Sequence, residues 1–282
     1  MMDGYDIAGE IRLERQVHKG SFLLVEGTTD IKRFHPLVDH EKCSTVNCYG
    51  KKNLVEAILL LYEDGFPGVL GLADADFDRV TNSLEEHEGL IYSVSHDFDA
   101  DWACENSMAK YVQEVGNPEK CAALGGPSEI GVKLRTGLKA LSVLRYLNEY
   151  QSLSYRLKSL RHDMFIQNMA VDLDLLIDDV FYGGHTGAQR AQLKALVVAH
   201  SAQEHDLIQL TSGHDLMRAL GLSMRTELAE RKHAQTWGRE VEMHFRLLFG
   251  DDEFRKSPLF TAIRAWEAEN TPYVILAARL RH

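Results

Sequence analysis

The sequence predicts an α/β fold, with a mostly parallel sheet flanked by helices and a mainly helical C-terminal region. In the N-terminal part, short apolar runs alternate with helix-forming stretches, which is the strand–helix–strand order of parallel sheets. From Trp102 onward, apolar residues recur instead at spacings of three and four, the period of helices. The 282 residues are 45% apolar, enough for a sizeable core in one large domain or two modest ones.

Four short strands are expected in the sheet. They cover residues 22–25, 43–48, 69–73 and 90–95. The first and third runs are continuously apolar, as buried parallel strands are, whereas the second alternates. Gly27 permits a sharp turn after the first strand, and Thr28 or Thr29 is placed to cap a helix there. An apolar helix over 54–62 is expected after the second strand.

The C-terminal part is expected to be helical. Its helices cover residues 108–115, 138–147, 153–160 and 188–205, and an amphipathic helical tail covers 239–282. A flexible glycine-rich loop is expected at 183–187. We divide the chain accordingly into an α/β core, residues 1–115, and a mainly helical region, residues 116–282.

Acidic side chains stand where two of the expected strands end. Glu26 follows the first strand, and Asp30 comes about one helical turn later. Asp74 and Asp76 follow the third strand, so that on an extended chain both carboxylates lie on one side. Crowded carboxylates repel each other unless a cation lies between them, and Mg²⁺ (or Mn²⁺) prefers such oxygen ligands. We therefore expect these acids to hold one metal ion together at this edge of the sheet. The alternative for Asp74 and Asp76 is a solvated acidic turn.

Together these two motifs resemble the Toprim fold, which occurs in topoisomerases, primases and several nucleases. The likeness rests on Val-Glu-Gly-x-x-Asp at 25–30 and Ala-Asp-Ala-Asp at 73–76, and it covers about residues 18–110. It implies that Glu26, Asp74 and Asp76 hold one or two Mg²⁺ ions that carry phosphodiester chemistry. Asp30 matches a second acid that nuclease members carry after the glutamate.

A third acidic cluster follows the fourth strand, at Asp99 and Asp101. Toprim relatives grouped as the DUF4435 family carry Asp-x-Glu at the corresponding place, which implies that Asp99 and Asp101 are ligands of a second ion. The alternative is that Asp101 caps a helix beginning at Trp102.

Three further side chains are candidates for contacts to a phosphate. A glycine–histidine–aspartate–leucine motif also resembles the DUF4435 family, and it implies that His214 donates to a phosphate or to the leaving oxygen. The alternative is an exposed histidine after a helix cap at Ser212. Lys51 and Lys52, at the start of an expected helix, are placed to anchor a phosphate or are simply exposed.

Within the same group the chain resembles the Toprim effectors of the PARIS anti-phage defence systems. That resemblance implies an endoribonuclease that acts as a toxin effector, with tRNA as its substrate class. It also implies a partner ATPase that holds the nuclease inactive until infection, and a homodimer once the nuclease is released.

The formal net charge of −11 is unfavourable for binding nucleic acid, because phosphates are normally bound by basic surfaces. Basic residues nevertheless gather between Lys133 and Arg161, interleaved with Tyr146, Tyr150 and Tyr155. Tyrosines among cations suit stacking on the bases of RNA. The alternative is a solvated helix face with half-buried tyrosines.

The sequence also bears on location. No stretch approaches the roughly 18 apolar residues of a membrane span, so no membrane contact is expected. The first residues lack the features of a signal or transit peptide. The four cysteines show no Cys-x-x-Cys spacing, which favours reduced thiols in the cytoplasm.

We therefore interpret the chain as a metal-dependent phosphodiesterase, an endonuclease acting on RNA. A DNA nuclease of the OLD type remains an alternative, because the residues alone do not separate RNA from DNA. Asp-x-Asp also serves glycosyltransferases, which use it to hold a metal and a nucleotide diphosphate. In a non-catalytic binding module the same acids would form a regulatory metal site or a docking surface.

Overall fold

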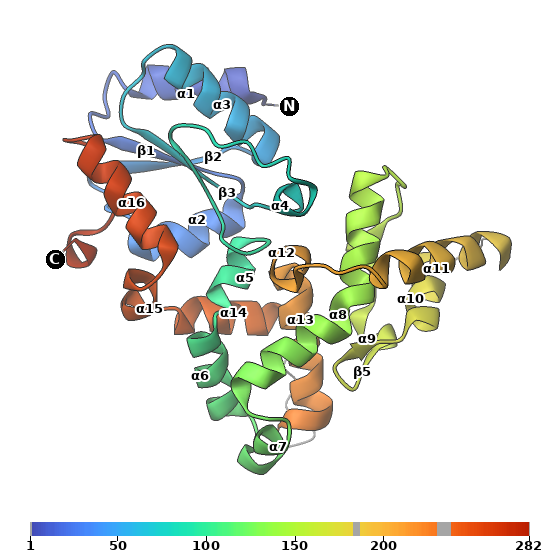
Figure 1. Cartoon of the computed structure of the whole chain (residues 1–282). Coiled ribbons are helices and arrows are strands. Elements are labelled where there is room, and N and C mark those ends of the chain that lie inside the picture. The colour runs from blue at the N-terminus through green and yellow to red at the C-terminus, as the bar shows by residue number, and fades with distance from the viewer. Residues whose placement is uncertain (1, 183–186, 230–237, 282) are drawn as a thin grey trace. The chain divides into compact units, whose positions relative to one another are not determined.

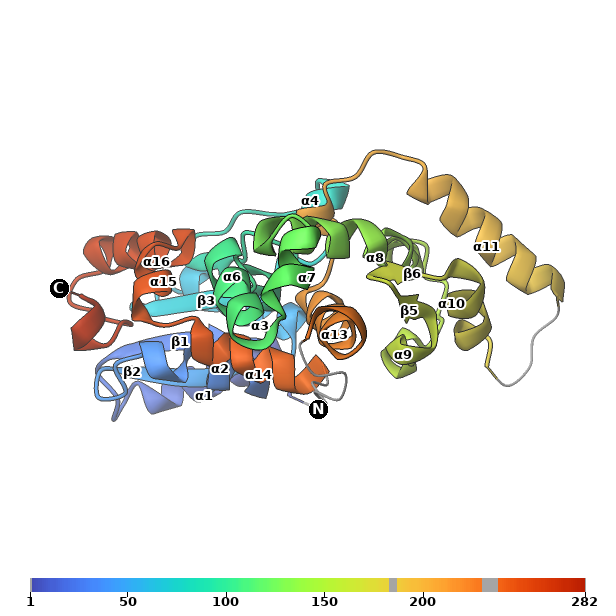
Figure 2. The same ribbon diagram turned by 90° about the horizontal axis from the view of Figure 1, so that it is seen from below.

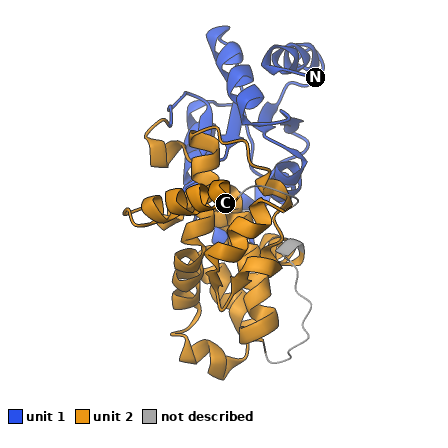
Figure 3. Ribbon diagram, turned by 90° about the vertical axis from the view of Figure 1, so that its right-hand side faces the viewer, with its two compact units in different colours: residues 1–75, 84–94, 249–282 blue, residues 76–83, 95–248 orange. Residues whose placement is uncertain are grey.

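The chain divides into two compact units in the computed structural model (Figures 1 and 3). The structure describes residues 2–182, 187–229 and 238–281. The first unit comprises residues 1–75, 84–94 and 249–282, and the second comprises 76–83 and 95–248. Apart from Gly187, the glycine-rich loop expected at 183–187 lies outside the described residues.

The first unit is built on a four-stranded parallel sheet in the order β2-β1-β3-β4. Its strands are β1 (Ser21–Val25), β2 (Cys43–Asn47), β3 (Val69–Ala73) and β4 (Leu90–Tyr92). β1 and β3 pair in the centre of the sheet and are buried along their whole length, as their continuous apolar runs predict. The expected α/β fold is confirmed, with each strand in its expected place and β4 shorter than expected.

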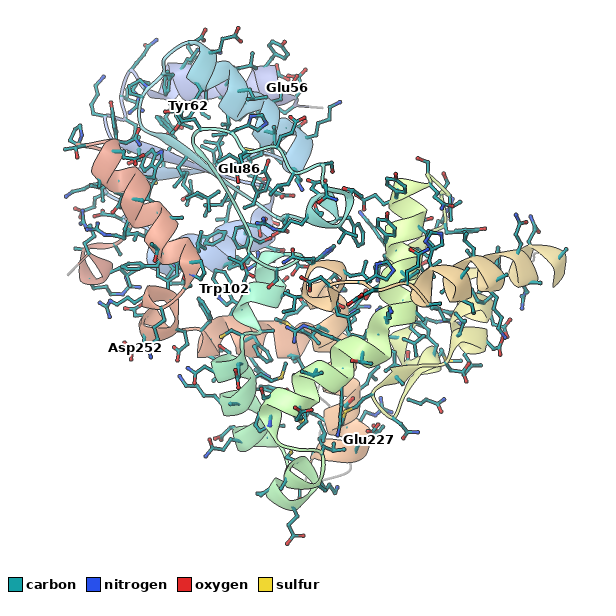
Figure 4. All side chains as sticks on the ribbon, in the orientation of Figure 1. Glu56, Tyr62, Glu86, Trp102, Glu227 and Asp252 are labelled. Atoms are coloured by element: carbon teal, nitrogen blue, oxygen red, sulfur yellow. The ribbon has the colours of Figure 1, made fainter. Side chains whose placement is uncertain are left out.

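Helices flank this sheet (Figures 1 and 2). α1 (Gly4–Glu14) and α3 (Lys51–Glu63) pack against each other and share a hydrophobic core with Phe22 and Leu24 of β1. Glu56 of α3, labelled in Figure 4, accepts a hydrogen bond from the backbone N–H of Gly4 at 3.1 Å. The hydroxyl of Tyr62, also labelled there, donates to the carbonyl of Val69 in β3 at 3.0 Å. α2 (Thr28–Phe34) contacts β2.

The C-terminal segment belongs to the first unit. It contains α15 (Asp251–Arg255) and α16 (Pro258–Glu269). The buried carboxylate of Glu267 accepts the backbone N–H groups of Ile275 and Leu276 at 2.8 and 2.7 Å. The N–H of Val274 donates to the hydroxyl of Ser21 in β1 at 2.8 Å. The bonds of Glu267 brace the segment internally, and the bond from Val274 to Ser21 ties residues 249–282 to the sheet, so the compact units differ from the expected division at residue 115.

The second unit is mainly helical, and α8 (Pro127–Tyr150) is its longest element. The other helices are α4 (Asp78–Thr81), α5 (Phe98–Trp102), α6 (Glu105–Val115), α7 (Pro118–Ala123), α9 (His162–Phe165), α10 (Leu173–Val180), α11 (Gly187–Ser201), α12 (Leu207–Leu210), α13 (Gly213–Ser223) and α14 (Gly238–Leu248). β5 (Ile166–Gln167) and β6 (Ala170–Val171) form a hairpin. Leu134, Leu138 and Leu141 of α8 are fully buried, as their helical spacing predicts.

One expected helix of this unit is absent. Residues 153–160 have helical spacing, yet they form only a single 3₁₀ turn, Leu157–Ser159. Ser152 and Ser154 have φ angles of +52° and +63°, which a right-handed helix does not contain. No helix in the described part of the chain is long and apolar enough to cross a membrane.

Candidate active site

Glu26 and Asp74 come together at the carboxyl edge of the sheet. Glu26 directly follows β1, and Asp74 directly follows β3, the strand that pairs with β1. The backbone N–H of Asp74 donates to Oε1 of Glu26 at 2.8 Å, and both residues are half-buried. The side chain of one acid therefore holds the backbone of the other, and two carboxylate-bearing residues share one edge of the sheet.

The segment that carries Asp74 is fixed on its other side by Ser93 and Lys51. The N–H of Ala75 donates to the hydroxyl of Ser93 at 2.8 Å, just beyond β4. The ammonium of Lys51 donates to the carbonyl of Ala75 at 3.3 Å and lies 5.6 Å from the ring centroid of Tyr92. Lys51 thus places a positive charge next to the acids.

Lys52, which sequence reasoning treated like Lys51, has an exposed side chain, whereas Lys51 is half-buried. Both begin α3, but successive side chains on a helix point about 100° apart, so only one of them faces the acidic segment. Of the two lysines, Lys51 is the one that belongs to the site.

Cys48 lies close to this site and responds to its charge. Burial, and after it the negative charge of Glu26, raise the pKa of Cys48 to about 12. All four cysteines are free, and three of them are buried. Cys48 therefore remains a neutral thiol at physiological pH.

Asp30 has a structural role that was not among the expectations from the sequence. Its Oδ2 accepts the backbone N–H of Gly27 at 3.0 Å, and its Oδ1 pairs with the buried guanidinium of Arg33. Gly27 is the N-cap of α2, so the expected cap at Thr28 or Thr29 is wrong. Asp30 closes the first turn of the helix from inside, and both of its carboxylate oxygens are engaged by protein donors.

Asp76 does not continue the strand that Asp74 follows. β3 ends at Ala73, and Asp76 has a left-handed φ of +49°, so the alternation that places two carboxylates on one side does not apply. In the second unit, its backbone N–H donates to the carbonyl of His96 at 2.7 Å.

The third acidic cluster lies in the second unit, around the start of α5. Its N-cap is Asp97, which accepts the N–H of Ala100 at 2.7 Å and that of Gly213, the first residue of α13, at 2.9 Å. Burial raises the pKa of Asp97 to about 6, with His96 opposing and Asp99 adding to the shift. Sequence reasoning missed Asp97, although an aspartate just before a helix is the ordinary signal of a cap.

Asp99 and Asp101 lie inside α5, which starts at Phe98. The alternative that Asp101 caps a helix beginning at Trp102 is therefore wrong. Oδ1 of Asp101 instead accepts the N–H of Ser95 at 2.7 Å, and Asp99 lies 4.0 Å from the guanidinium of Arg246.

His214 pairs with a carboxylate in the second unit. Its Nδ1 contacts Oε1 of Glu242 on α14, and 42% of its side chain is exposed. Ser212 caps α13 by accepting the N–H of Asp215 at 3.2 Å, as one of the two interpretations of this motif expected. The pairing with Glu242 has no signal in the sequence.

The aspartate of the same motif, Asp215, is fully buried. Its carboxylate is held by the guanidinium of Arg145, with one contact at 2.8 Å, and by Nε2 of His162 at 2.7 Å. Burial would raise the pKa of Asp215, but Arg145 and His162 together hold it well below its ordinary range. Asp215 is therefore a structural anion.

Several basic side chains between Lys133 and Arg161 are bonded to carbonyl or carboxylate groups of the second unit itself. Lys133 and Lys139 donate to backbone carbonyls at 2.8 and 2.7 Å, and Arg161 pairs with Asp179. Arg145 serves Asp215, as described above. Four cations of the segment thus have partners within the protein. Tyr146 and Tyr155 are half-buried, as the alternative of a solvated helix face expected, whereas Tyr150 is 65% exposed.

The site of the first unit fits a hard divalent cation in its chemistry. Glu26 and Asp74 offer carboxylate oxygens, and Mg²⁺ is commonly held by one or two carboxylates together with waters and substrate phosphates. Within residues 2–182, 187–229 and 238–281, no group of three or more His, Cys, Asp or Glu side chains is arranged to hold a metal ion. The protein would therefore supply two carboxylates of the first unit, and water or substrate the remaining ligands.

The fold and the site define an α/β protein with two acids and a lysine at the carboxyl edge of its parallel sheet. Comparison with known proteins adds no family to this description. No protein-family model matches the sequence, and no curated protein matches it either.

Proposed function

We propose that the chain is a Mg²⁺-dependent endoribonuclease. The observation that supports this most is the hydrogen bond from the backbone of Asp74 to Glu26, because it joins the ends of two paired strands into one acidic site. Ligands of α/β sheets bind at this edge. The lysine beside the acids suits a substrate with a phosphate at the reacting position.

Each residue of the site has a defined task in this proposal. Glu26 and Asp74 would hold Mg²⁺ (or Mn²⁺). When bound, the ion supplies a water of lowered pKa and positive charge opposite the leaving oxygen. Lys51 attracts the scissile phosphate and offsets its charge, and Ser93 keeps the segment that carries Asp74 in place.

Several residues stay sequence predictions in this scheme. Asp76, Asp99 and Asp101 are predicted further ligands, Lys52 and His214 are predicted phosphate contacts, and Asp30 is predicted to be a ligand on the resemblance alone. The contacts of Asp30 to Gly27 and Arg33 favour a structural role instead.

The wider role follows from the resemblance to Toprim effectors of the PARIS systems. We propose that the protein acts in the cytoplasm against phage and cleaves tRNA. A partner ATPase would restrain it until infection, after which it would form a homodimer.

A substrate panel tests the proposed activity. Purified protein is incubated with total tRNA, messenger RNA and plasmid DNA, each with Mg²⁺, Mn²⁺ or EDTA, and the products are separated on gels. We expect metal-dependent cleavage of RNA that Asp74→Asn abolishes, because that variant removes a carboxylate charge and leaves the Asp74 backbone bond to Glu26 intact. Cleavage of plasmid alone would indicate the DNA nuclease, and cleavage of nothing with any metal would refute nuclease function.

A further inference from the structure

The chain after β2 contains one extra residue, Tyr49, next to Glu26. The N–H of Cys48 donates to the carbonyl of Val25 at 2.9 Å, and the N–H of Gly50 donates to the carbonyl of Glu26 at 2.8 Å. The two donors are two residues apart, whereas the two acceptors are adjacent. Tyr49 is therefore one extra residue, a bulge directly beyond the last pair of the ladder between β1 and β2, which Val25 and Asn47 form. Bulges re-aim side chains and are frequent next to active sites.

The backbone of Tyr49 is strained. Its φ is +56°, in the left-handed region that bulky residues rarely adopt. The surrounding loop imposes this conformation: the N–H of Tyr49 donates to the side chain of Asn47 at 2.9 Å, and Asn53 donates to the carbonyl of Cys48 at 3.0 Å. Strain of this kind persists where the surroundings fix it, and it concentrates at functional sites.

Packing does not explain why a tyrosine occupies this position. The residue is 63% exposed, so its ring gains little from burial. Asparagine or glycine would adopt the same backbone with less strain. Tyr49 thus carries an exposed aromatic ring one residue before Gly50, whose N–H donates to the carbonyl of Glu26, and two residues before Lys51, whose ammonium donates to the carbonyl of Ala75.

We propose that Tyr49 stacks on an unpaired base of the RNA substrate, next to the phosphate that is cleaved. The inference rests on the proposed function and adds to it the form of the substrate, a single-stranded segment. Base–aromatic stacking needs an accessible base face, which an unpaired nucleotide offers and a continuous duplex does not. It tolerates any sequence, because every base has such a face.

The test compares Tyr49→Asn with wild type. Asparagine accepts a left-handed φ, so this variant removes the ring while it relieves the strain. Tyr5→Asn is the matched control, because Tyr5 lies in the same unit, on α1, and is also 63% exposed. Binding is measured by fluorescence anisotropy in Ca²⁺ buffer, once with a labelled unpaired 12-nucleotide RNA and once with the same RNA paired to its complementary strand. Cleavage of both is measured in Mg²⁺, and thermal unfolding of each protein is recorded.

We expect Tyr49→Asn to bind the unpaired RNA about five- to 150-fold more weakly. This range is the stacking energy of one base on an aromatic ring, converted into a ratio of dissociation constants. Its melting temperature should equal or exceed that of wild type, whereas a packing role for the ring would lower it. Tyr5→Asn should match wild type in every measurement, and Tyr49→Phe, which keeps the ring, should restore binding.

Two results would overturn the inference while leaving the nuclease intact. One is wild-type affinity and cleavage in Tyr49→Asn, and the other is an equal loss for duplex and unpaired RNA. Wild-type protein that neither binds nor cleaves RNA would remove the proposed function and this inference together.

Discussion

Glu26 has two tasks that two substitutions separate. Its charge is proposed to hold the metal, and its Oε1 accepts the backbone N–H of Asp74 at 2.8 Å. Glu26→Gln removes the charge but keeps an oxygen in the same place, so the bond from Asp74 is retained. Glu26→Ala removes both. A purely catalytic role predicts that the two variants are equally stable, whereas the geometry predicts that they differ.

The magnitude follows from the bond that alanine deletes. A hydrogen bond to a charged acceptor contributes about 1.5–3 kcal/mol to the free energy of unfolding. For a chain of this size, 1 kcal/mol shifts the melting temperature by about 2–4 °C. Glu26→Ala should therefore melt about 3–12 °C below wild type. Glu26→Gln should lose less, about 2–6 °C, because its amide oxygen still accepts from Asp74 but without the charge, and a neutral hydrogen bond contributes about 0.5–1.5 kcal/mol. Both variants should lose cleavage by about 100-fold or more, as expected when one charge that stabilises the transition state is removed.

The assay pairs thermal unfolding with RNA cleavage in Mg²⁺ on the same preparations. Wild-type cleavage by Glu26→Gln would show that the charge of Glu26 is not needed and would refute the assignment of this residue. A melting temperature of Glu26→Ala equal to that of wild type would contradict the structural part of the argument and leave the catalytic part standing.

Three further predictions concern charged side chains. Lys51→Met should lower cleavage about tenfold or more while Lys52→Met changes it less than about threefold, as initial rates on RNA would reveal, because only Lys51 faces the acidic segment. The pKa of Asp97, raised from 3.8 to about 6, means that the folded protein retains a proton that the unfolded chain loses; the resulting stability is present below about pH 4 and is lost as the pH rises through about 6. The difference in the free energy of urea unfolding between wild type and Asp97→Asn should thus change by about 2 kcal/mol between pH 4 and 7, and a pH-independent difference would contradict the raised pKa. Asp215→Ala should lower the free energy of unfolding by about 3–5 kcal/mol, measured in urea at pH 7, because it leaves Arg145 without its buried anion; a loss below about 1 kcal/mol would show that the pair is dispensable.

The sheet was predictable because a strand that is buried on both faces appears in the sequence as a continuous apolar run. The apolar runs at 22–25 and 69–73 have no other simple interpretation once glycines and acids bound them. The helix predicted at 153–160 is wrong because apolar periodicity indicates which residues are buried and not which backbone conformation they adopt. Ser152 and Ser154 have positive φ angles, which a right-handed helix does not contain. The attachment of residues 249–282 to the sheet of the first unit involves the bond between Val274 and Ser21, residues that are 253 positions apart, and no local pattern encodes such a bond.

The site was predictable only where topology alone decides proximity. Parallel strands that pair end at the same edge, so Glu26 and Asp74 were expected to meet and do so. The roles of Asp30 and Lys51 depend instead on helix registry. Asp30 occupies the third position of α2, where an acid reaches back to the N-cap, and this capping-box spacing was a signal available in the sequence.

Charge gives the last link between the fold and the proposed substrate. A protein of net charge −11 does not attract RNA over its whole surface. Within the basic segment 133–161, Arg145 and Arg161 are paired with Asp215 and Asp179 of the protein itself. In the proposed function, affinity for RNA would then come from contacts made at the site. There, a single ammonium lies on the acidic segment, and an aromatic ring is held exposed by a strained bulge. Stacking does not depend on net charge, so the proposed nuclease would bind RNA through its bases despite its acidic surface.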